Sequence, residues 1–151
     1  MLKIREATIN DSEAIINFQI AMALETEHLK LDVSTVKKGV RNVFSDFAKG
    51  KYFVGEVDGH VVASLMITYE WSDWRNGYVW WIQSVYIEPK FRGLKIFKKM
   101  YMYLKEVVKN DDTLIGIRLY VDKTNINAQK VYKKIGMNSE HYQMYEWMKN
   151  L

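Results

Sequence analysis

One stretch of the chain decides the fold: residues 83–97 read QSVYIEPKFRGLKIF. The stretch ends a nearly all-apolar run, residues 78–87, which is the pattern of a strand buried on both faces. Pro89 ends this strand, and a helix follows through about Lys109. Because the first amides of a helix have no internal partner and lie at the positive end of its dipole, a helix start after a buried strand is suited to binding phosphate.

Basic side chains surround this helix start. Arg92, Lys95 and Lys98 follow one another at a spacing of three, and five basic residues lie within ten positions: Lys90, Arg92, Lys95, Lys98 and Lys99. The cluster predicts a site for an anion, of which a pyrophosphate is the best match. An ordinary strand-to-helix turn with solvated lysines would give the same local pattern, and both interpretations stay open at this point.

Working outward, period-2 and period-3.6 patterns alternate along the chain. Before the stretch, the patterns predict a strand at 2–8, helices at 12–24 and 33–48, and strands at 51–57 and 60–69 that are joined by an Asp58-Gly59 hairpin turn. After it, they predict a strand at 115–121, a helix at 125–135 and a strand at 142–148. The order β-α-α-β-β-β-α-β-α-β predicts one mixed α/β domain over residues 1–151, with a partly antiparallel sheet.

Composition narrows the class of protein. The chain has 151 residues, of which 48% are hydrophobic and 26% charged, with no cysteine and a formal net charge of +4. These values exclude a mostly disordered chain and a disulfide framework, and no apolar run approaches the length of a membrane helix. We therefore expect a cytoplasmic protein without membrane or nucleic-acid partners. His28, His60 and His141 lack metal-ligand spacing, so no metal site is predicted.

A second group of residues follows the predicted strand at 115–121. Asn125 is placed to cap the next helix, and Tyr132 lies at i+7 on nearly the same face. A phenol in this position could donate or accept a proton. Tyr132 would equally suit the half-buried face of an amphipathic helix.

Together, the two groups resemble the GCN5-related N-acetyltransferase (GNAT) superfamily over nearly the whole chain. Val85, Ile87 and Pro89 resemble the family's strand end, and residues 92–97 resemble its signature of Arg or Gln, two residues, Gly, one residue, then Gly or Ala. Residues 125–132, followed by Ile135-Gly136-Met137, resemble its later Asn-x-x-Ala-x-x-x-Tyr and Leu-Gly-Phe segments. Lys95 and Phe97 depart from the signature at its Gly and its Gly/Ala positions, which predicts weaker or shifted cofactor binding.

The resemblance implies acetyl-CoA as the co-substrate and direct attack by an amine on its thioester. It implies that the strands at 79–87 and 115–121 splay apart, that pantetheine extends the exposed strand edge, and that the pyrophosphate lies on the amides of 92–97. The implied cofactor-binding residues are Val85, Ile87, Arg92, Gly93, Leu94, Lys95, Ile96, Phe97, Lys98, Asn125 and Ala128. Tyr132 would protonate the departing thiolate, and backbone amides near Val85 would polarise the carbonyl.

The acceptor side is less defined. Some family members carry a catalytic Glu nine residues before the signature Arg, where this chain has Gln83, so Glu70 is the first choice for a base acting through water. The expected acceptor-binding residues are Glu25, Glu27, Trp71, Asp73 and Gln83. Carboxylates beside tryptophans suit a cationic amine, although the tryptophans could instead pack in the core or at a dimer contact.

Three functions remain open. The first is acetylation of a primary amine on a small polar or cationic metabolite. The second is acetylation of a lysine side chain or N-terminal amine of a protein, and the third is a non-catalytic acyl-CoA-binding module on the same fold. The abundance of aromatic residues would also suit a homodimer.

Overall fold

A computed structural model describes residues 1–150. The chain divides into two compact units, Met1–Arg118 and a second from Leu119 onward. The helices and strands of the first unit are β1 (Leu2–Glu6), α1 (Ser12–Glu27), α2 (Val33–Ser45), β2 (Lys51–Val57), β3 (His60–Ser72), β4 (Gly77–Ile87), α3 (Ile96–Lys109) and β5 (Leu114–Arg118). The second unit contains α4 (Ile126–Lys134). Three short 3-10 helices cover Ile9–Asp11, Phe47–Lys49 and Pro89–Phe91.

The first unit is built on a five-stranded sheet in the order β1-β2-β3-β4-β5. The first three pairs of neighbours are antiparallel and β4 pairs with β5 in parallel, which confirms the predicted mixed α/β class. The β2–β3 turn forms at Asp58-Gly59 as predicted, with φ values of 49° and 82°. Two consecutive positive φ values match the right-handed twist of the hairpin, and glycine adopts them without strain.

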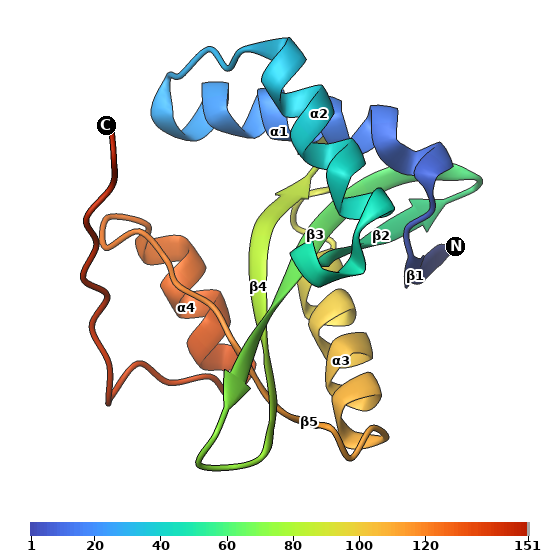
Figure 1. Ribbon diagram of the computed structural model, residues 1–151. Helices are drawn as coiled ribbons and strands as arrows, with labels where there is room; N and C mark the ends of the chain where they lie inside the picture. The colour runs from blue at the N-terminus through green and yellow to red at the C-terminus, as the bar shows by residue number, and fades with distance from the viewer. Residues whose placement is uncertain (151) are drawn as a thin grey trace. The chain divides into compact units, whose positions relative to one another are not determined.

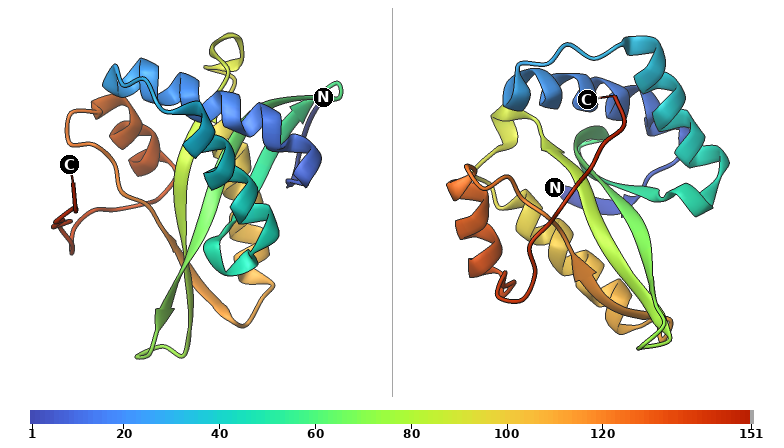
Figure 2. Two further views of the ribbon diagram at one scale, coloured as in Figure 1. Left: turned by 45° about the horizontal axis from the view of Figure 1, so that its top comes forward. Right: turned by 60° about the vertical axis from the view of Figure 1, so that its left-hand side comes forward.

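Helices cover both faces of this sheet. Helices α1 and α2 cross one face and α3 lies against the other (Figures 1 and 2). Alternation along β2 explains the arrangement: Tyr52 and Val54 pack with Ile15, Ile16, Val40 and Val43 of the helix pair. Phe53 points the opposite way, with its ring 6.0 Å from that of Tyr103 in α3. The sheet is therefore buried on both sides, as the apolar runs predict.

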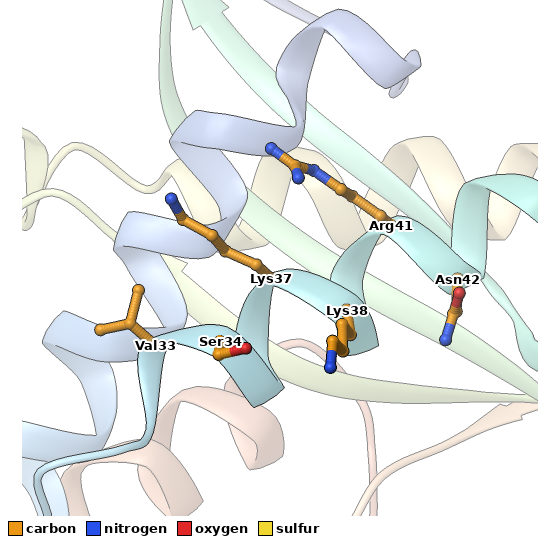
Figure 3. Close-up of a pocket in the computed structure, with 6 residues that line it drawn as sticks. All are labelled: Val33, Ser34, Lys37, Lys38, Arg41 and Asn42. Carbon is orange, nitrogen blue, oxygen red and sulfur yellow. The ribbon is translucent and has the colours of Figure 1, made fainter.

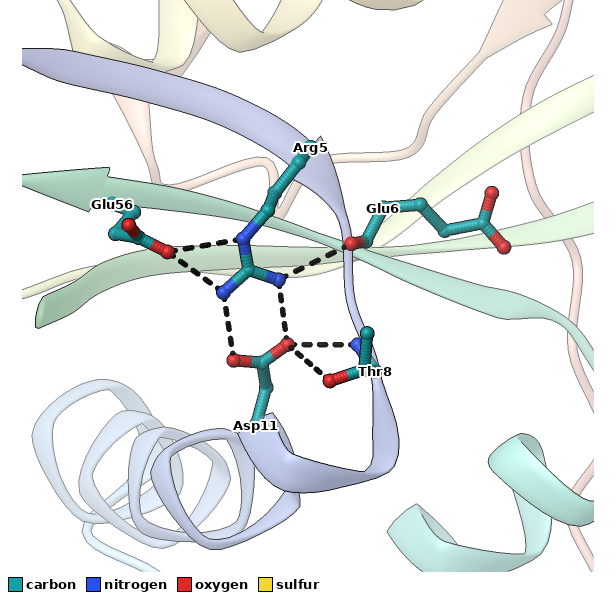
Figure 4. Close-up of polar contacts among 5 residues, drawn as sticks. All are labelled: Arg5, Glu6, Thr8, Asp11 and Glu56. Carbon is teal, nitrogen blue, oxygen red and sulfur yellow. Dashed lines mark hydrogen bonds and ion pairs between the residues drawn. The ribbon is translucent and has the colours of Figure 1, made fainter. Parts of the chain in front are cut away.

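A fully bonded arginine ties the start of the chain to α1 (Figure 4). Arg5 donates from Nη1 and Nη2 to the two carboxylate oxygens of Asp11, at 2.8 and 3.0 Å, and from Nε and Nη2 to Glu56. Asp11 also accepts from the Thr8 amide, at 2.8 Å, which closes a capping box at the helix entry. The Arg5 hydrogen bonds hold the pKa of the Asp11 carboxyl below its ordinary value.

Several predicted elements differ from the structure. Helix α1 and strand β3 run on to Glu27 and Ser72, beyond the predicted 24 and 69, whereas β1 and β5 end at Glu6 and Arg118, before the predicted 8 and 121. Helix α2 stops at Ser45 rather than near 48, because Asp46 adopts an extended backbone and its side chain accepts from the Ala48 amide. Residues 142–148 form no strand within residues 1–150, and their side chains are exposed. Their alternating pattern is compatible with a strand, but a strand also requires a neighbouring edge with which to pair.

No helix within residues 1–150 is both long and apolar enough to cross a membrane.

Candidate active site

A β-bulge interrupts β4 near its end. Met66 of β3 pairs with Gln83 and Ser64 pairs with Tyr86, so the single residue Leu65 lies opposite two residues of β4, Ser84 and Val85. Ser84 has φ of 53°, in the left-handed region that a serine adopts only at a cost. Such bulges re-aim backbone groups and are common beside active sites. The backbone around Val85 is thus turned out of the regular ladder.

The outer edge of β4 is paired over only part of its length. Its parallel ladder with β5 runs from Tyr78 to Trp81 and ends at Arg118 of β5. Among residues 1–118, the remaining part of β4, residues 82–87, has no strand on this side. An extended group that carries amide and carbonyl functions could therefore add to this edge.

The turn after β4 leads to a helix terminus without a side-chain cap. Lys95 is the N-cap residue of α3, and a lysine side chain has no atom that can accept a hydrogen bond from the first-turn amides. Its φ of 59° is again left-handed, at the position where the family signature has glycine. At Gly93, whose φ is 81°, an added Cβ would meet no atom within 4 Å. This turn therefore combines open space at Gly93 with first-turn amides of α3 that could donate hydrogen bonds to a bound anion.

The side chains of the signature segment point in two directions. Leu94, Lys95 and Lys98 are exposed, whereas Ile96 and Phe97 are buried. Phe97 is only 8% exposed, and its ring stacks on Tyr101 at 6.4 Å between centroids. Its bulk therefore lies in the helix packing rather than across the turn, and its departure from the signature leaves the space at the turn free.

Arg92 is folded back over the end of β4. Its Nε donates to the carbonyl oxygen of Ile87 at 2.9 Å and its Nη2 donates to Glu25 at 2.8 Å. Its guanidinium carbon lies 5.4 Å from the ring centre of Tyr86, whose hydroxyl donates to the second Glu25 oxygen at 3.0 Å. The Arg92 hydrogen bond holds the pKa of the Glu25 carboxyl below its ordinary value, and burial raises the pKa of the Tyr86 phenol. The structure thus joins a predicted cofactor residue to a predicted acceptor residue.

The other acceptor candidates lie in separate places. Gln83, next to the bulge, donates from Nε2 to Thr68 at 2.5 Å. Glu27 is exposed in the last turn of α1. Trp71 and Asp73 are exposed at the β3–β4 hairpin, at the end of β4 away from the bulge, and the nearby Trp74 is 90% exposed. The structure does not bring this hairpin group together with Glu25.

Glu70, the predicted base, also belongs to the hairpin end of β3. It lies opposite Val79, and its carboxylate accepts a hydrogen bond from Arg118 of β5. Val85 is six residues farther along β4, so at ~3.3 Å per residue the bulge is separated from this carboxylate by several side-chain lengths. The geometry does not favour direct proton transfer from a group at the bulge to Glu70.

The second unit contains the other predicted catalytic group. Asn125 caps α4 as expected, because its side chain accepts from the Ala128 amide at 3.1 Å. Gly136, with φ of 94°, follows the end of the helix. Burial raises the pKa of the Tyr132 phenol above its ordinary value. Tyr132 is therefore protonated near neutral pH, as a proton donor must be.

A hollow along the outer side of α2 is lined by several basic side chains (Figure 3). It is lined by Val33, Ser34, Lys37, Lys38, Arg41 and Asn42. All six residues come from one helix, and Arg41 is paired with Glu13 of α1 at 2.6 Å. This hollow contains none of the predicted site residues, and we assign it no chemistry.

Comparison with known proteins decides the family. The sequence model described as Acetyltransferase (GNAT) family matches residues 21–137. The chain belongs to the GNAT acetyltransferase family. A solved structure of a possible acetyltransferase from Clostridium difficile 630 is 44% identical, with a TM-score of 0.92 and coverage of 99% of this chain and 98% of the other. A search of curated proteins gives no match.

More distant structures share the fold. A predicted acetyltransferase from Clostridium acetobutylicum, solved with acetyl-CoA, is 19% identical with a TM-score of 0.73, and the match covers 97% of this chain and 96% of that one. Glucosamine-6-phosphate N-acetyltransferase from Arabidopsis thaliana is 20% identical with a TM-score of 0.72, and the match covers 99% of each chain. Membership of the GNAT family, together with the 44% identical structure, makes this protein an N-acetyltransferase that uses acetyl-CoA.

The residues of the acetyltransferase fit that co-substrate. The part of β4 beyond Trp81 offers a strand edge, the bulge interrupts the ladder at Val85, and the start of α3 offers amides without a side-chain cap. Exposed lysines at 95 and 98 add positive charge for a polyphosphate. An extended ligand with amide groups and a polyphosphate can use a strand edge and free helix amides, so these residues are compatible with acetyl-CoA.

Sequence reasoning missed three polar groups, two of them beside the bulge and one in α1. Tyr86 is the hydrogen-bond partner of Glu25, and Ser64, opposite Tyr86, has a fully buried hydroxyl. Neither the Ser64 hydroxyl nor the buried amide nitrogen of Gln19 in α1 has a hydrogen-bond partner within residues 1–150. The available signal was a polar residue within an apolar pattern: Ser64 in VVASLMI, and Gln19 on the inward side of α1.

Proposed function

We propose that this acetyltransferase transfers the acetyl group directly to the primary amine of a small polar or cationic metabolite. The observation that carries the proposal is the bulge at Ser84 and Val85, next to an edge of β4 that is unpaired within residues 1–118. Turned-out amides at such a point are suited to stabilising the oxygen of a tetrahedral intermediate.

The proposed co-substrate contacts follow from the same elements. Val85 and Ile87 would pair with the pantetheine amides, and the turn from Arg92 to Lys98 would hold the pyrophosphate. Asn125 and Ala128 complete the proposed cofactor-binding set. Ile96 and Phe97 would contribute only backbone groups, because their side chains are buried. When bound, acetyl-CoA supplies an activated thioester.

Two proton transfers accompany the reaction. We assign Tyr132 as the acid that protonates the departing thiolate, because a phenol is protonated near neutral pH and can donate that proton to the stronger base that leaves. The amine must lose its own proton before it attacks. Since Glu70 is bound to Arg118 and lies opposite Val79, we propose that this proton leaves through water rather than passing directly to Glu70.

A cationic acceptor is supported by the end of α1. Glu25 and Glu27 both lie in its last turn, which contains no basic residue. Carboxylates at a helix C-terminus oppose the helix dipole by about 0.3–1 kcal/mol each, so their position is not explained by helix stability. Arg92 supplies one positive charge here, to Glu25, and an ammonium group of the acceptor would supply another.

The test is acetylation of a panel of amines, with the reaction measured by the release of the free thiol from acetyl-CoA. The panel contains polyamines, amino sugars, amino-acid derivatives, neutral amines, and peptides with a free lysine or N-terminus. Tyr132→Phe should lower kcat by about 10²-fold with little change in KM, as expected for loss of a proton donor. Turnover of peptides alone would indicate a protein acetyltransferase, and turnover of neutral amines alone would contradict the cationic acceptor.

A further inference from the structure

Glu25 is the point at which the acceptor side and the cofactor turn meet. Its two carboxylate oxygens are both engaged, one by the Tyr86 hydroxyl and the other by Nη2 of Arg92. The Tyr86 ring is fixed in turn by Phe18 of α1, at 5.1 Å between ring centres. The carboxylate is therefore oriented by a buried residue, while its charge is balanced by a surface residue.

The ion pair between Arg92 and Glu25 can be replaced by contacts with other charged groups. Only two of its five N–H groups find an acceptor within residues 1–150, one on Ile87 and one on Glu25. The side chains of Arg92 and Glu25 are 48% and 39% exposed. An ion pair with this exposure is weak, so another charged group can displace either partner.

A pyrophosphate is a stronger partner for Arg92 than one carboxylate. It carries more negative charge, and its oxygens can accept two parallel hydrogen bonds from a guanidinium, whereas Glu25 accepts one because its other oxygen is bound by Tyr86. If Arg92 turns toward a pyrophosphate at the start of α3, the Glu25 carboxylate loses its positive partner but keeps the Tyr86 hydrogen bond. An oriented carboxylate without a cation is then available at the end of α1.

We propose that Glu25 is a specificity-determining residue shared by two cations: Arg92 in the free protein and the ammonium group of the acceptor in the loaded enzyme. The inference rests on the proposed function, and it adds that acetyl-CoA and a cationic acceptor strengthen each other's binding. By linkage, the coupling is equal in both directions. Glu25 would select for acceptors that carry positive charge.

The first experiment titrates acetyl-CoA into the wild-type protein and two variants by calorimetry. Glu25→Gln keeps the size of the side chain and an acceptor for the Tyr86 hydroxyl but releases Arg92, so acetyl-CoA should bind about threefold more tightly. Glu13→Gln is the matched control, because it makes the same charge change in an exposed ion pair of α1, with Arg41. Its affinity for acetyl-CoA should stay at the wild-type value.

A merely structural role predicts the opposite result. If Glu25 only anchors the Arg92 turn, Glu25→Gln would weaken acetyl-CoA binding, and that outcome, or an unchanged affinity, overturns the sharing of Glu25. If the wild-type protein binds no acetyl-CoA, the proposed function falls as well. Thermal unfolding of both variants checks that they fold.

The second experiment uses the best cationic amine from the panel. In Glu25→Gln, KM for this amine should rise about threefold or more while KM for acetyl-CoA falls. Opposite shifts of the two constants are the signature of a shared residue. If both constants rise together, Glu25 supports the site without being exchanged, and the proposal is overturned.

Discussion

Two arginines bind carboxylates at the two ends of α1, and they do so in different ways. Arg5 uses all five N–H groups on Asp11, Glu56 and the carbonyl oxygen of Glu6. Arg92 uses two, and three remain without a protein acceptor within residues 1–150. Asp11 is at the helix start, where the dipole favours an acid, and Glu25 is at the end, where it does not. The first contact is saturated and structural, whereas the second leaves hydrogen-bonding capacity for a ligand.

The largest expected effect comes from breaking the saturated contact. Arg5→Ala leaves Asp11, whose side chain is 8% exposed, without its cation. Removal of one partner from a largely buried pair should lower the free energy of unfolding by about 3 kcal/mol, and Tm by roughly 10 °C. Arg41→Ala, which breaks an exposed pair with Glu13, should cost less than about 1 kcal/mol. If thermal unfolding shows equal losses of stability for Arg5→Ala and Arg41→Ala, the full set of hydrogen bonds at Arg5 does not add to stability.

Acid should weaken the same contact. Because the pKa of Asp11 is lower in the folded than in the unfolded chain, its contribution is fully present above the unfolded value and is lost as pH falls through the folded value. The difference in unfolding free energy between wild type and Asp11→Asn should therefore shrink below about pH 5. Urea titrations over a pH series measure it. If the difference between wild type and Asp11→Asn instead grows as the pH falls, the pKa of Asp11 is not lowered in the folded chain.

Breaking the unsaturated contact should affect binding more than stability. Arg92→Ala should change the free energy of unfolding by less than about 1 kcal/mol but weaken acetyl-CoA about tenfold, since one charge-assisted hydrogen bond is lost. The loss should diminish at high salt. Calorimetry at two salt concentrations measures it, with Arg41→Ala as the control on another surface. If affinity is unchanged, Arg92 has no phosphate to bind.

The smallest effect concerns the backbone beside Arg92. Lys95 has a left-handed backbone that costs a non-glycine residue about 1–2 kcal/mol, and a glycine variant removes this cost but gains freedom in the unfolded chain, which offsets part of the benefit. Lys95→Gly should thus stabilise the protein by about 0.5 kcal/mol in urea unfolding. Lys98→Gly, inside α3, should destabilise it by a similar amount. Destabilisation by both would show that Lys95 makes a contact that offsets its strain.

Local patterns predicted much of the fold. The Asp58-Gly59 turn, the run from β4 into α3 and the cap at Asn125 each depend on residues within a few positions of one another. The segment 142–148 has the same kind of local pattern but forms no strand, because pairing depends on a partner that the pattern does not specify. Local chemistry thus predicts elements better than it predicts their pairing.

The contacts within the candidate active site were harder to predict from the sequence than the fold. The Arg92–Glu25 contact joins residues 67 positions apart, and nothing in either segment indicates the other. Likewise, Glu70 looks like a free carboxylate until Arg118 of β5 is placed beside it. The bulge at Ser84 was also hidden, because β4 is apolar on both faces and an extra residue breaks no alternation.

That extra residue has a consequence for how such a chain diversifies. Gln83 and Tyr86 pair with Met66 and Ser64, between which β3 has one residue. A deletion of Ser84 would leave each of these pairs in place and turn the end of β4 into an ordinary ladder. The protein would keep its layers and its core but lose the outward turn at Val85. In this fold a single inserted codon therefore separates a regularly paired strand from one whose backbone can bind the carbonyl group of a thioester.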